Sequence, residues 1–450
     1  MVSARCFNAL TALVLTVCAC SYAEFTVFDV FTGQGPQSQP SISGSTVVWV
    51  EKFGDSSRIF IKDADDTLKA PDMIGQFPGD AYPDFDGRFV VWHSDNDPDH
   101  DIWCCDTSGI IAADPFAVAP SSNVQKFPAV SNGIISWQEY AYVSEIWKAS
   151  IVDEVFEANK VLIETDPNCY DPDISESLIA WEDARDGAEN RDIRGYDYTG
   201  GGEIIICQAE GIQENPAVDG RNVVWADSRG GNSDIYLRDI DAALEIPVCI
   251  SEGEQNNPAI CGRWIAWQDA RNGTYQIYLY DIKSFTTYQL NPTAQSQEMP
   301  ALSQELICWQ ENGLIKAAVL PDASELELTS PAGGETLIAG FEHLVTWDSS
   351  LPSGHTIDIE YSDDLGLTWH RIASSVEDTG QWFWQDIPSS GGEKRILRVI
   401  DADSDYNADA GGLFDVSDCD PSLTADANGD CVVDLADFSE LAVQWQQKGY

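Results

Sequence analysis

A proline and a tryptophan recur along most of this chain at a fixed separation. In each copy the proline stands nine residues before the tryptophan, and the pairs are Pro40/Trp49, Pro83/Trp92, Pro128/Trp137, Pro172/Trp181, Pro216/Trp225, Pro258/Trp267 and Pro300/Trp309. Successive tryptophans are 42 to 45 residues apart. A repeat of this length is typical of four short strands that form one propeller blade. The sequence therefore predicts an all-β, seven-bladed β-propeller.

The fifth copy shows how the strands of a blade follow one another. Residues 216–218 predict a first strand, 219–220 a turn, and 222–226 a second strand. Residues 234–239 and 245–250 predict the third and fourth strands. The last copy stops after three strands, while residues 25–30 predict a lone strand near the N-terminus. We expect that strand to complete the last blade, because closing the ring removes exposed strand edges.

The charge of the chain is strongly acidic. Its 450 residues contain 24 Lys and Arg against 75 Asp and Glu, a formal net charge of −51. Such a surface repels phosphate backbones and anionic lipid headgroups. We therefore exclude nucleic acid as a partner.

The N-terminus has the pattern of a secretory signal peptide. Residues 1–23 combine Arg5, an apolar run over 7–20 and a small-residue site over 21–23. No later stretch is apolar enough for a transmembrane segment. We expect a secreted protein, extracellular or at the cell surface. The alternative is a lipoprotein anchored at Cys20, because residues 17–20 resemble a lipoprotein cleavage box.

Three copies also share the pattern W-x-D-[AS]-R, at residues 181–185, 225–229 and 267–271. We interpret it as a salt bridge that holds a loop, and the alternative is a ring of charges that grips a ligand. The elements xPxxSG-xxVVW and DIYxxD over residues 24–321 resemble the TolB-like (WD40-like) family of exported bacterial propellers. That family contains protein-binding propellers and carbohydrate lyases.

Five cysteines are expected to act as small buried hydrophobic residues, namely Cys104, Cys105, Cys207, Cys249 and Cys308.

Residues 322–417 change to short strands without the repeat, such as 326–331, 343–347, 357–361 and 396–400. Their number and length match an immunoglobulin-like β-sandwich. The SPxGGE and VTW elements resemble Ig-like or fibronectin-type modules, which implies a spacer or an adhesive module. Residues 362–369 match the Asp-box pattern S-x-D-x-G-x-T-W, and we expect this motif to be a structural hairpin turn.

Residues 418–450 contain a twelve-residue loop with oxygen ligands at calcium-binding spacing. The predicted metal ligands are Asp426, Asn428, Asp430, the Val432 carbonyl, Asp434 and Asp437. A helix is expected over 438–445. Cys419 and Cys431 flank one short segment and are the expected disulfide pair.

This loop and its helix resemble one type I dockerin repeat, a single EF-hand-like unit of secreted polysaccharide-degrading systems. Cys431 stands where the repeat has glycine, and dockerins carry two repeats where this chain has one. The resemblance implies bound Ca²⁺ and a cohesin-like partner.

No catalytic residue can be assigned from the sequence. The chain has no nucleophile elbow, no HExxH and no phosphate-binding loop. We interpret the stretch that contains His93, His100, Asp95, Asp97 and Asp99 as a solvated acidic loop. The alternative hypothesis is that these side chains bind a metal ion.

Two functions follow from these observations. The preferred one is an exported non-catalytic binding or scaffold protein, with the propeller as the interaction platform and the tail for Ca²⁺-dependent attachment or assembly. Its partner would be a protein or a polysaccharide at the cell surface. The alternative is a secreted carbohydrate-active enzyme, a glycoside hydrolase or polysaccharide lyase. An enzyme's channel should hold acids, His or Arg that break the repeat, whereas a binder should show rings of side chains that follow it.

Overall fold

The computed structural model describes residues 20–23, 25–33, 35–79, 81–94, 100–109, 114–118, 120–152, 155–156, 161–164, 168–321, 325–389, 394–404 and 407–417. Over these ranges the chain is all-β and contains no helix. Accordingly, none of the described residues belongs to a helix that is long and apolar enough to cross a membrane.

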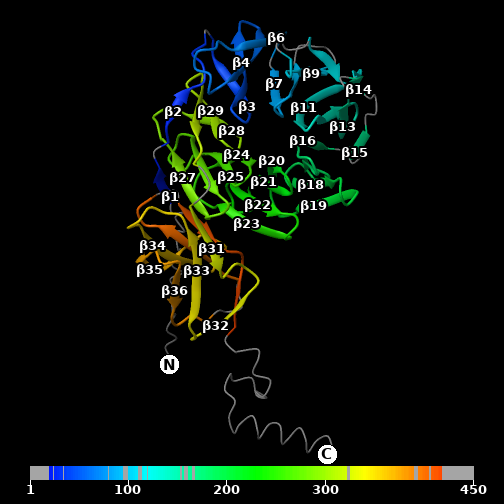
Figure 1. Cartoon of the computed structure of the whole chain (residues 1–450). Coiled ribbons are helices and arrows are strands. Elements are labelled where there is room, and N and C mark those ends of the chain that lie inside the picture. The colour runs from blue at the N-terminus through cyan, green and yellow to red at the C-terminus, as the bar shows by residue number, and fades with distance from the viewer. Residues whose placement is uncertain are drawn as a thin grey trace, which may run out of the picture.

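Seven of the described sheets follow one another around a ring (Figure 1). The first blade comprises β3 (Gln37–Ser43), β4 (Thr46–Phe53), β5 (Ser56–Asp63) and β6 (Asp72–Pro78). The second comprises β7 (Ala81–Phe85), β8 (Phe89–Ser94), β9 (Ile102–Asp106) and β10 (Phe116–Val118). The third comprises β11 (Val124–Ser131), β12 (Ile134–Tyr140) and β13 (Ser144–Val152), and both β14 (Val155–Phe156) and β15 (Val161–Glu164) pair with β13. Within each blade the strands run antiparallel in chain order, as the repeat predicts.

The remaining four blades have the same order. They comprise β16 (Cys169–Ile174), β17 (Leu178–Asp183), β18 (Asp192–Asp197) and β19 (Gly202–Cys207); β20 (Gln213–Asp219), β21 (Asn222–Asp227), β22 (Asp234–Asp239) and β23 (Leu244–Cys249); β24 (Gln255–Cys261), β25 (Trp264–Asp269), β26 (Gln276–Asp281) and β27 (Thr286–Leu290); and β28 (Gln297–Leu302), β29 (Leu306–Glu311) and β30 (Leu314–Val319).

The N-terminal segment completes the last blade. Strand β2 (Val27–Asp29) pairs antiparallel with β30 and forms the outer strand of that sheet. The predicted closure of the ring is confirmed. Strand β1 (Cys20–Ala23) runs parallel to β27, so cleavage of the predicted signal peptide after residue 23 would remove it.

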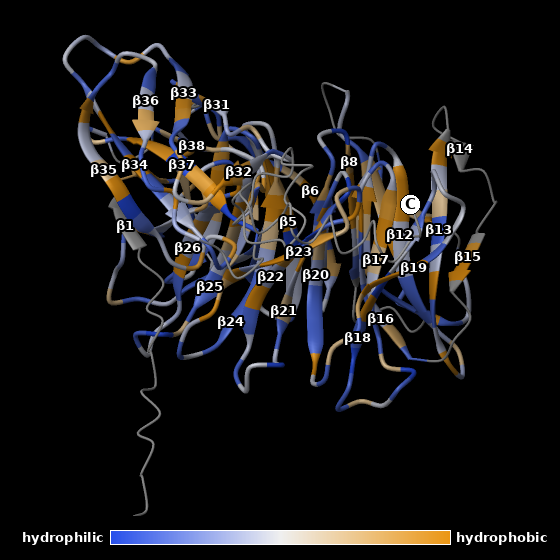
Figure 2. Cartoon of the chain, turned by 90° about the horizontal axis from the view of Figure 1, so that it is seen from below, coloured by the Kyte–Doolittle hydropathy of each residue, from blue (hydrophilic) through white to orange (hydrophobic). Residues whose placement is uncertain are grey.

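The repeated tryptophans form the core between blades. All seven are fully buried, and each packs on the preceding sheet. Trp225, for example, shares a cluster with Leu178 and Ile193 of the fourth blade, and Trp267 shares one with Val224 of the fifth. Figure 2 shows the corresponding pattern, with hydrophobic segments in many strands and largely hydrophilic loops at the lower edge. The period of the sequence thus reflects one tryptophan per blade interface.

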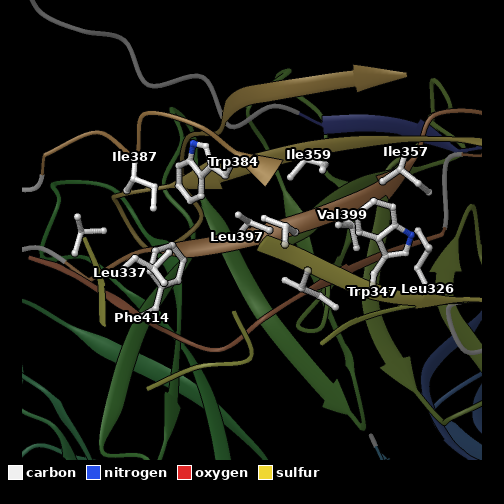
Figure 3. Close-up of a cluster of buried hydrophobic side chains, with 13 residues drawn as sticks. Leu326, Leu337, Trp347, Ile357, Ile359, Trp384, Ile387, Leu397, Val399 and Phe414 are labelled. Carbon is white, nitrogen blue, oxygen red and sulfur yellow. The ribbon is translucent and has the colours of Figure 1, made fainter. Parts of the chain in front are cut away.

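Residues 325–417 form a second unit of three sheets. One sheet joins β31 (Leu326–Ser330), β33 (His343–Ser349) and β36 (Gln381–Trp384). A second joins β35 (His370–Glu377), β34 (Thr356–Ser362), β37 (Ile396–Asp401) and β38 (Ala408–Ala410). A third pairs β32 (Thr336–Ile338) with β39 (Asp415–Ser417). Side chains from all three sheets share one apolar core that includes Trp347, Trp384, Val399 and Phe414 (Figure 3).

The second unit is joined to the sixth blade through the turn between β26 and β27. The Ala410 amide donates to the Lys283 carbonyl at 2.8 Å. Arg398 Nη1 donates to the carbonyl oxygens of Ser284 and Phe285, each at 3.2 Å. These contacts place the second unit beside β22 to β27 at the outside of the ring (Figure 1).

Candidate functional site

A hollow of about 280 Å³ lies at the centre of the ring. The first strand of every blade faces this centre (Figure 1). Five of the repeated prolines line the hollow, Pro40, Pro83, Pro128, Pro172 and Pro216. The central opening, as we call it, is thus built from the same repeat that supplies the tryptophan core.

The prolines lie within the first strands rather than at their starts, which corrects one prediction. Strand β20, for example, begins at Gln213, three residues before Pro216. The pairing with β21 shifts between Glu214 and Ala217, and Asn215 has φ of 52°. The bulge carries the proline, whose missing N–H would otherwise break the ladder.

Six blades share this bulge, and the second blade does not. The residue before the proline has positive φ at Gln39, Phe127, Asp171, Asn215, Asn257 and Met299. In the second blade, β7 pairs with β8 without a register shift. The ring is therefore irregular at Tyr82.

His93 has a structural role beside this irregular position. Its side chain is buried, and its ring stacks on Tyr82 with centroids 4.7 Å apart. Its Nδ1 accepts the amide of Phe127 in the next blade at 3.2 Å. Glu182 and Gln268 accept the amides of Asn215 and Met299 in the same way. Asp95, Asp97 and Asp99 lie outside the described residues, so the metal hypothesis for His93 and His100 stays a prediction.

Two aspartates break the repeat at the position after the proline. The seven residues at this position are Ser41, Asp84, Ala129, Asp173, Ala217, Ala259 and Ala301. Asp84 Oδ2 accepts the Val130 amide at 2.8 Å, and Asp173 Oδ2 accepts the Val218 amide at 2.7 Å. Each carboxyl group therefore ties its blade to the next.

Burial perturbs these carboxyl groups. Loss of solvent raises the pKa of Asp84 and raises the pKa of Asp173 to about 7, with repulsion between the two adding to the effect on Asp173. Burial also raises the pKa of Asp171, which lines the same opening. Among the described residues, the lining contains three carboxyl groups and no Lys, Arg or His. Alignment of the seven repeats on their prolines would have revealed Asp84 and Asp173 from the sequence alone.

The lining of the opening also includes aromatic and amide groups. Tyr82, Phe127 and Met299 contribute apolar surface, and Phe127 is 38% exposed. Gln39 Oε1 is buried and accepts no hydrogen bond from the described residues. The arrangement can accept a compact group that brings positive charge and hydrogen-bond donors.

We expect the free energy of unfolding to fall as pH rises from about 4 to about 7, because the carboxyl group of Asp173 stays protonated to a higher pH in the folded state than in the unfolded state. Its native pKa is about 7 against 3.8 for the unconstrained group, so the native state holds a proton that the unfolded state releases. The stabilisation is fully present below pH 4 and is lost as pH rises to about 7. Asp173→Asn should raise the free energy of unfolding by about 2 to 4 kcal/mol at pH 8 and change it little at pH 4.

Urea denaturation of the parent and the variant at both pH values measures this difference in the free energy of unfolding. An Asp55→Asn control, at an exposed position, should show no such dependence, and an equal gain at both pH values would contradict the assignment.

The W-x-D-[AS]-R pattern is a structural unit, as the preferred interpretation states. Asp227 Oδ2 accepts the Trp225 indole N–H at 2.8 Å, and Oδ1 accepts the Arg229 amide at 2.9 Å. Arg229 Nη2 lies 2.6 Å from Asp227 Oδ2 and 2.9 Å from Cys207 Sγ in the preceding blade. The pattern therefore fixes a loop and links blades.

The five singled-out cysteines are buried, as predicted, namely Cys104, Cys105, Cys207, Cys249 and Cys308. Burial raises the pKa of Cys105 to about 11 and that of Cys207 to about 12. Both of these thiols are therefore protonated at neutral pH.

The Asp box is a structural turn, as predicted, and it also contacts the propeller. Asp364 Oδ1 accepts the Thr368 amide at 2.8 Å, and Ser362 Oγ accepts the Gly366 amide at 2.8 Å. Gly366 has φ of 91°, and a Cβ there would lie 2.6 Å from Phe285 of the sixth blade. The turn requires glycine on both grounds.

The predicted calcium ligands lie outside the described residues. This applies to Asp426, Asn428, Asp430, Val432, Asp434 and Asp437, to the helix over 438–445, and to Cys419 and Cys431. Calcium binding therefore stays a prediction.

A separate group, which the sequence analysis missed, brings His355 near Asp401 and Asp403. His355 Nδ1 lies 2.9 Å from Asp401 Oδ2, and the Asp403 carboxylate accepts the Thr356 amide, so these groups already partner the chain itself.

The ring of seven sheets around a central opening defines the chain as a β-propeller protein. No family model matches the sequence, and no curated protein matches it either. Solved structures do resemble it. An oligogalacturonate lyase from Vibrio parahaemolyticus is 10% identical, with 66% of this chain and 94% of that chain covered and a TM-score of 0.50. At this identity the likeness concerns the fold alone.

Two further solved structures are less similar in shape. TolB from Acinetobacter baumannii is 15% identical, with 61% of this chain and 79% of that chain covered and a TM-score of 0.40. A puromycin-hydrolyzing peptidase from Mycobacterium tuberculosis is 12% identical, with 70% of this chain and 60% of that chain covered and a TM-score of 0.47.

Proposed function

We propose that this chain is an exported, non-catalytic binding protein whose propeller receives a positively charged side chain of a protein partner. The observation that carries the proposal is the central opening, where three half-buried carboxyl groups meet and the described lining has no basic residue. A cationic group would supply the missing counter-charge. Tyr82 and Phe127 offer aromatic faces to the same group.

Two further properties of the chain support a basic partner. The net charge of −51 attracts cationic surfaces over a distance and speeds their association. The volume of about 280 Å³ suits one long side chain better than a polymer. A partner that inserts a Lys or Arg from a loop would satisfy both the size and the charge of the opening.

The rest of the chain would present this platform outside the cell. In this proposal residues 24–321 are a TolB-like propeller, residues 322–417 an Ig-like spacer, and residues 418–450 a type I dockerin-like unit. Bound Ca²⁺ would order the tail for attachment to a cohesin-like partner. The signal peptide over 1–23, or the lipoprotein alternative at Cys20, would direct export.

A second candidate, the carbohydrate-active enzyme, is favoured by one observation. Asp84 and Asp173 are acids that break the repeat at the channel, which is the feature expected of an enzyme. Both carboxyl groups, however, accept amides of the neighbouring blade, so they have a structural role that needs no substrate. The binding function therefore remains the proposal.

The experiment is calorimetric titration of the exported chain with two peptides that differ only by Lys or Ala at one central position. We expect the Lys peptide alone to bind, more tightly at pH 8 than at pH 6, because ionised carboxylates favour a cation. Asp171→Asn should weaken binding about tenfold, while Asp55→Asn, which removes the same charge from an exposed position, should not.

Two outcomes would overturn the proposal. Equal binding of both peptides, or an equal effect of the two substitutions, would reduce the interaction to general charge attraction. A parallel incubation with a panel of plant and algal polysaccharides tests the second candidate, because release of reducing sugar or unsaturated product would establish an enzyme.

A further inference from the structure

A second and larger hollow, of about 810 Å³, lies in the second unit. It opens between β36 and the start of β35. In the described sheets β36 pairs only with β33, and β35 pairs only with β34. The hollow therefore occupies the open edge of the sandwich, where the two facing sheets each end in an edge strand. We call it the edge groove.

The wall of the edge groove is aromatic. Tyr361, Trp382, Phe383 and Trp384 line it. The Tyr361 ring lies 5.4 Å from the Trp384 ring and 5.0 Å from the His370 ring, so these rings form a row. Phe383 is 52% exposed. Trp384 is only 2% exposed and belongs to the core, so Tyr361, Trp382 and Phe383 supply the aromatic surface that a ligand can reach.

Five polar side chains of the edge groove lack hydrogen-bond partners in the described part of the chain. The side chains of Gln381, Gln385 and Asp386 make no hydrogen bond to a described residue, and neither do the indole N–H groups of Trp382 and Trp384. Figure 3 shows the Trp384 indole nitrogen on the side of the ring away from Phe414.

Five of the seven repeated propeller tryptophans behave differently, whereas the indoles of Trp49 and Trp92 have no acceptor among the described residues. The indoles of Trp181, Trp225 and Trp267 each donate to the aspartate two residues later. Buried or half-buried indoles normally find such an acceptor. The edge groove therefore offers donors and acceptors that the fold itself does not use.

The charge of the groove is balanced. Arg371 lies 2.7 Å from Asp358 and 3.0 Å from Glu360, and Asp386 adds a carboxylate to the lining. The groove therefore has no excess of positive charge to attract an anionic ligand. Its chemistry is that of aromatic faces bordered by planar amide and carboxylate groups.

We infer that the edge groove binds a neutral oligosaccharide. A pyranose ring has an apolar face of C–H groups, which packs on an aromatic ring, and a rim of hydroxyl groups, which exchange hydrogen bonds with amides, carboxylates and indole N–H groups. The volume accommodates several sugar units along the edge. This site is separate from the central opening and does not depend on the function proposed for it.

The test is calorimetric titration of the full chain with the hexasaccharides of cellulose, xylan and mannan, and with hexagalacturonate as an anionic comparison. We expect at least one neutral hexasaccharide to bind, with quenching of tryptophan fluorescence. Phe383→Ala and Gln385→Ala should each weaken that binding at least tenfold. Both side chains are exposed, so these variants should fold as the parent does.

Matched controls come from the propeller. Tyr142→Ala removes another exposed aromatic group, 96% exposed, and Gln295→Ala another exposed amide; both should bind sugar as the parent does. Absence of binding to every neutral hexasaccharide at millimolar concentration would overturn the inference. Unchanged binding by Phe383→Ala and Gln385→Ala would overturn it as well. Loss of sugar binding in Phe127→Ala alone would move the site to the central opening, whereas failure of the Lys peptide would affect only the proposed function.

Discussion

Replacing Trp225 with alanine should lower the free energy of unfolding by about 4 kcal/mol. The side chain is fully buried between the fourth and fifth blades. Its loss leaves a cavity between two sheets and removes the indole donor from Asp227. Denaturation by guanidinium, followed through the change in fluorescence, measures the effect.

Two variants separate packing from hydrogen bonding at this position. Trp225→Phe keeps a ring in the interface but removes the N–H, and we expect a loss of about 1 to 2 kcal/mol. Tyr142→Ala, at an exposed position, should change stability by less than about 0.5 kcal/mol. A Trp225→Ala protein as stable as Tyr142→Ala would show that the blade interfaces do not depend on the repeated tryptophan.

Replacing Arg398 with methionine should cost about 3 kcal/mol and separate the second unit from the ring. The guanidinium bonds Glu360 Oε2 at 2.7 Å and Thr286 Oγ1 at 3.2 Å, besides the two carbonyl groups of the β26–β27 turn. It also lies 3.8 Å above the Trp369 ring. Methionine keeps part of the apolar length but removes the donor from these acceptors and one of the two arginines that pair with Glu360.

The readout is limited proteolysis together with chemical denaturation. We expect the variant to be cleaved between the two units and to unfold in two transitions. Arg371→Met is the matched control, because it removes a second partner of Glu360 from a side chain that is 54% exposed. That change should cost less than about 1 kcal/mol. Equal effects of the two substitutions would mean that Arg398 does not hold the joint.

Much of the fold was predictable because the repeat encodes contacts between neighbours in sequence. The period locates the blades, and the missing fourth strand of the last copy predicts the pairing of β2 with β30. The pattern W-x-D-[AS]-R encodes a loop within five residues, so its interpretation needed no distant partner. The Asp box was predictable for the same reason.

The central opening and the edge groove were not predicted, because each assembles side chains that are distant in sequence. Asp84 and Asp173 belong to the second and fourth blades, and their proximity follows from the curvature of the ring. The bulge before six of the seven prolines was also missed, because a strand pattern does not show which residue adopts positive φ. The edge groove depends on which strands end their sheets, and hydrophobic alternation does not specify strand order.

The pairing of Val27 with Ala318 also constrains the order of folding. Nearly the whole ring must be synthesised before the strand that closes it can find its partner, so this contact carries a large loop-closure entropy. Contacts of such sequence separation form late and slow the folding of β proteins. Until then the edge of β30 is open to strands of other molecules. The last step of folding is therefore the one most sensitive to protein concentration, because aggregation through the edge of β30 competes with the pairing of β2.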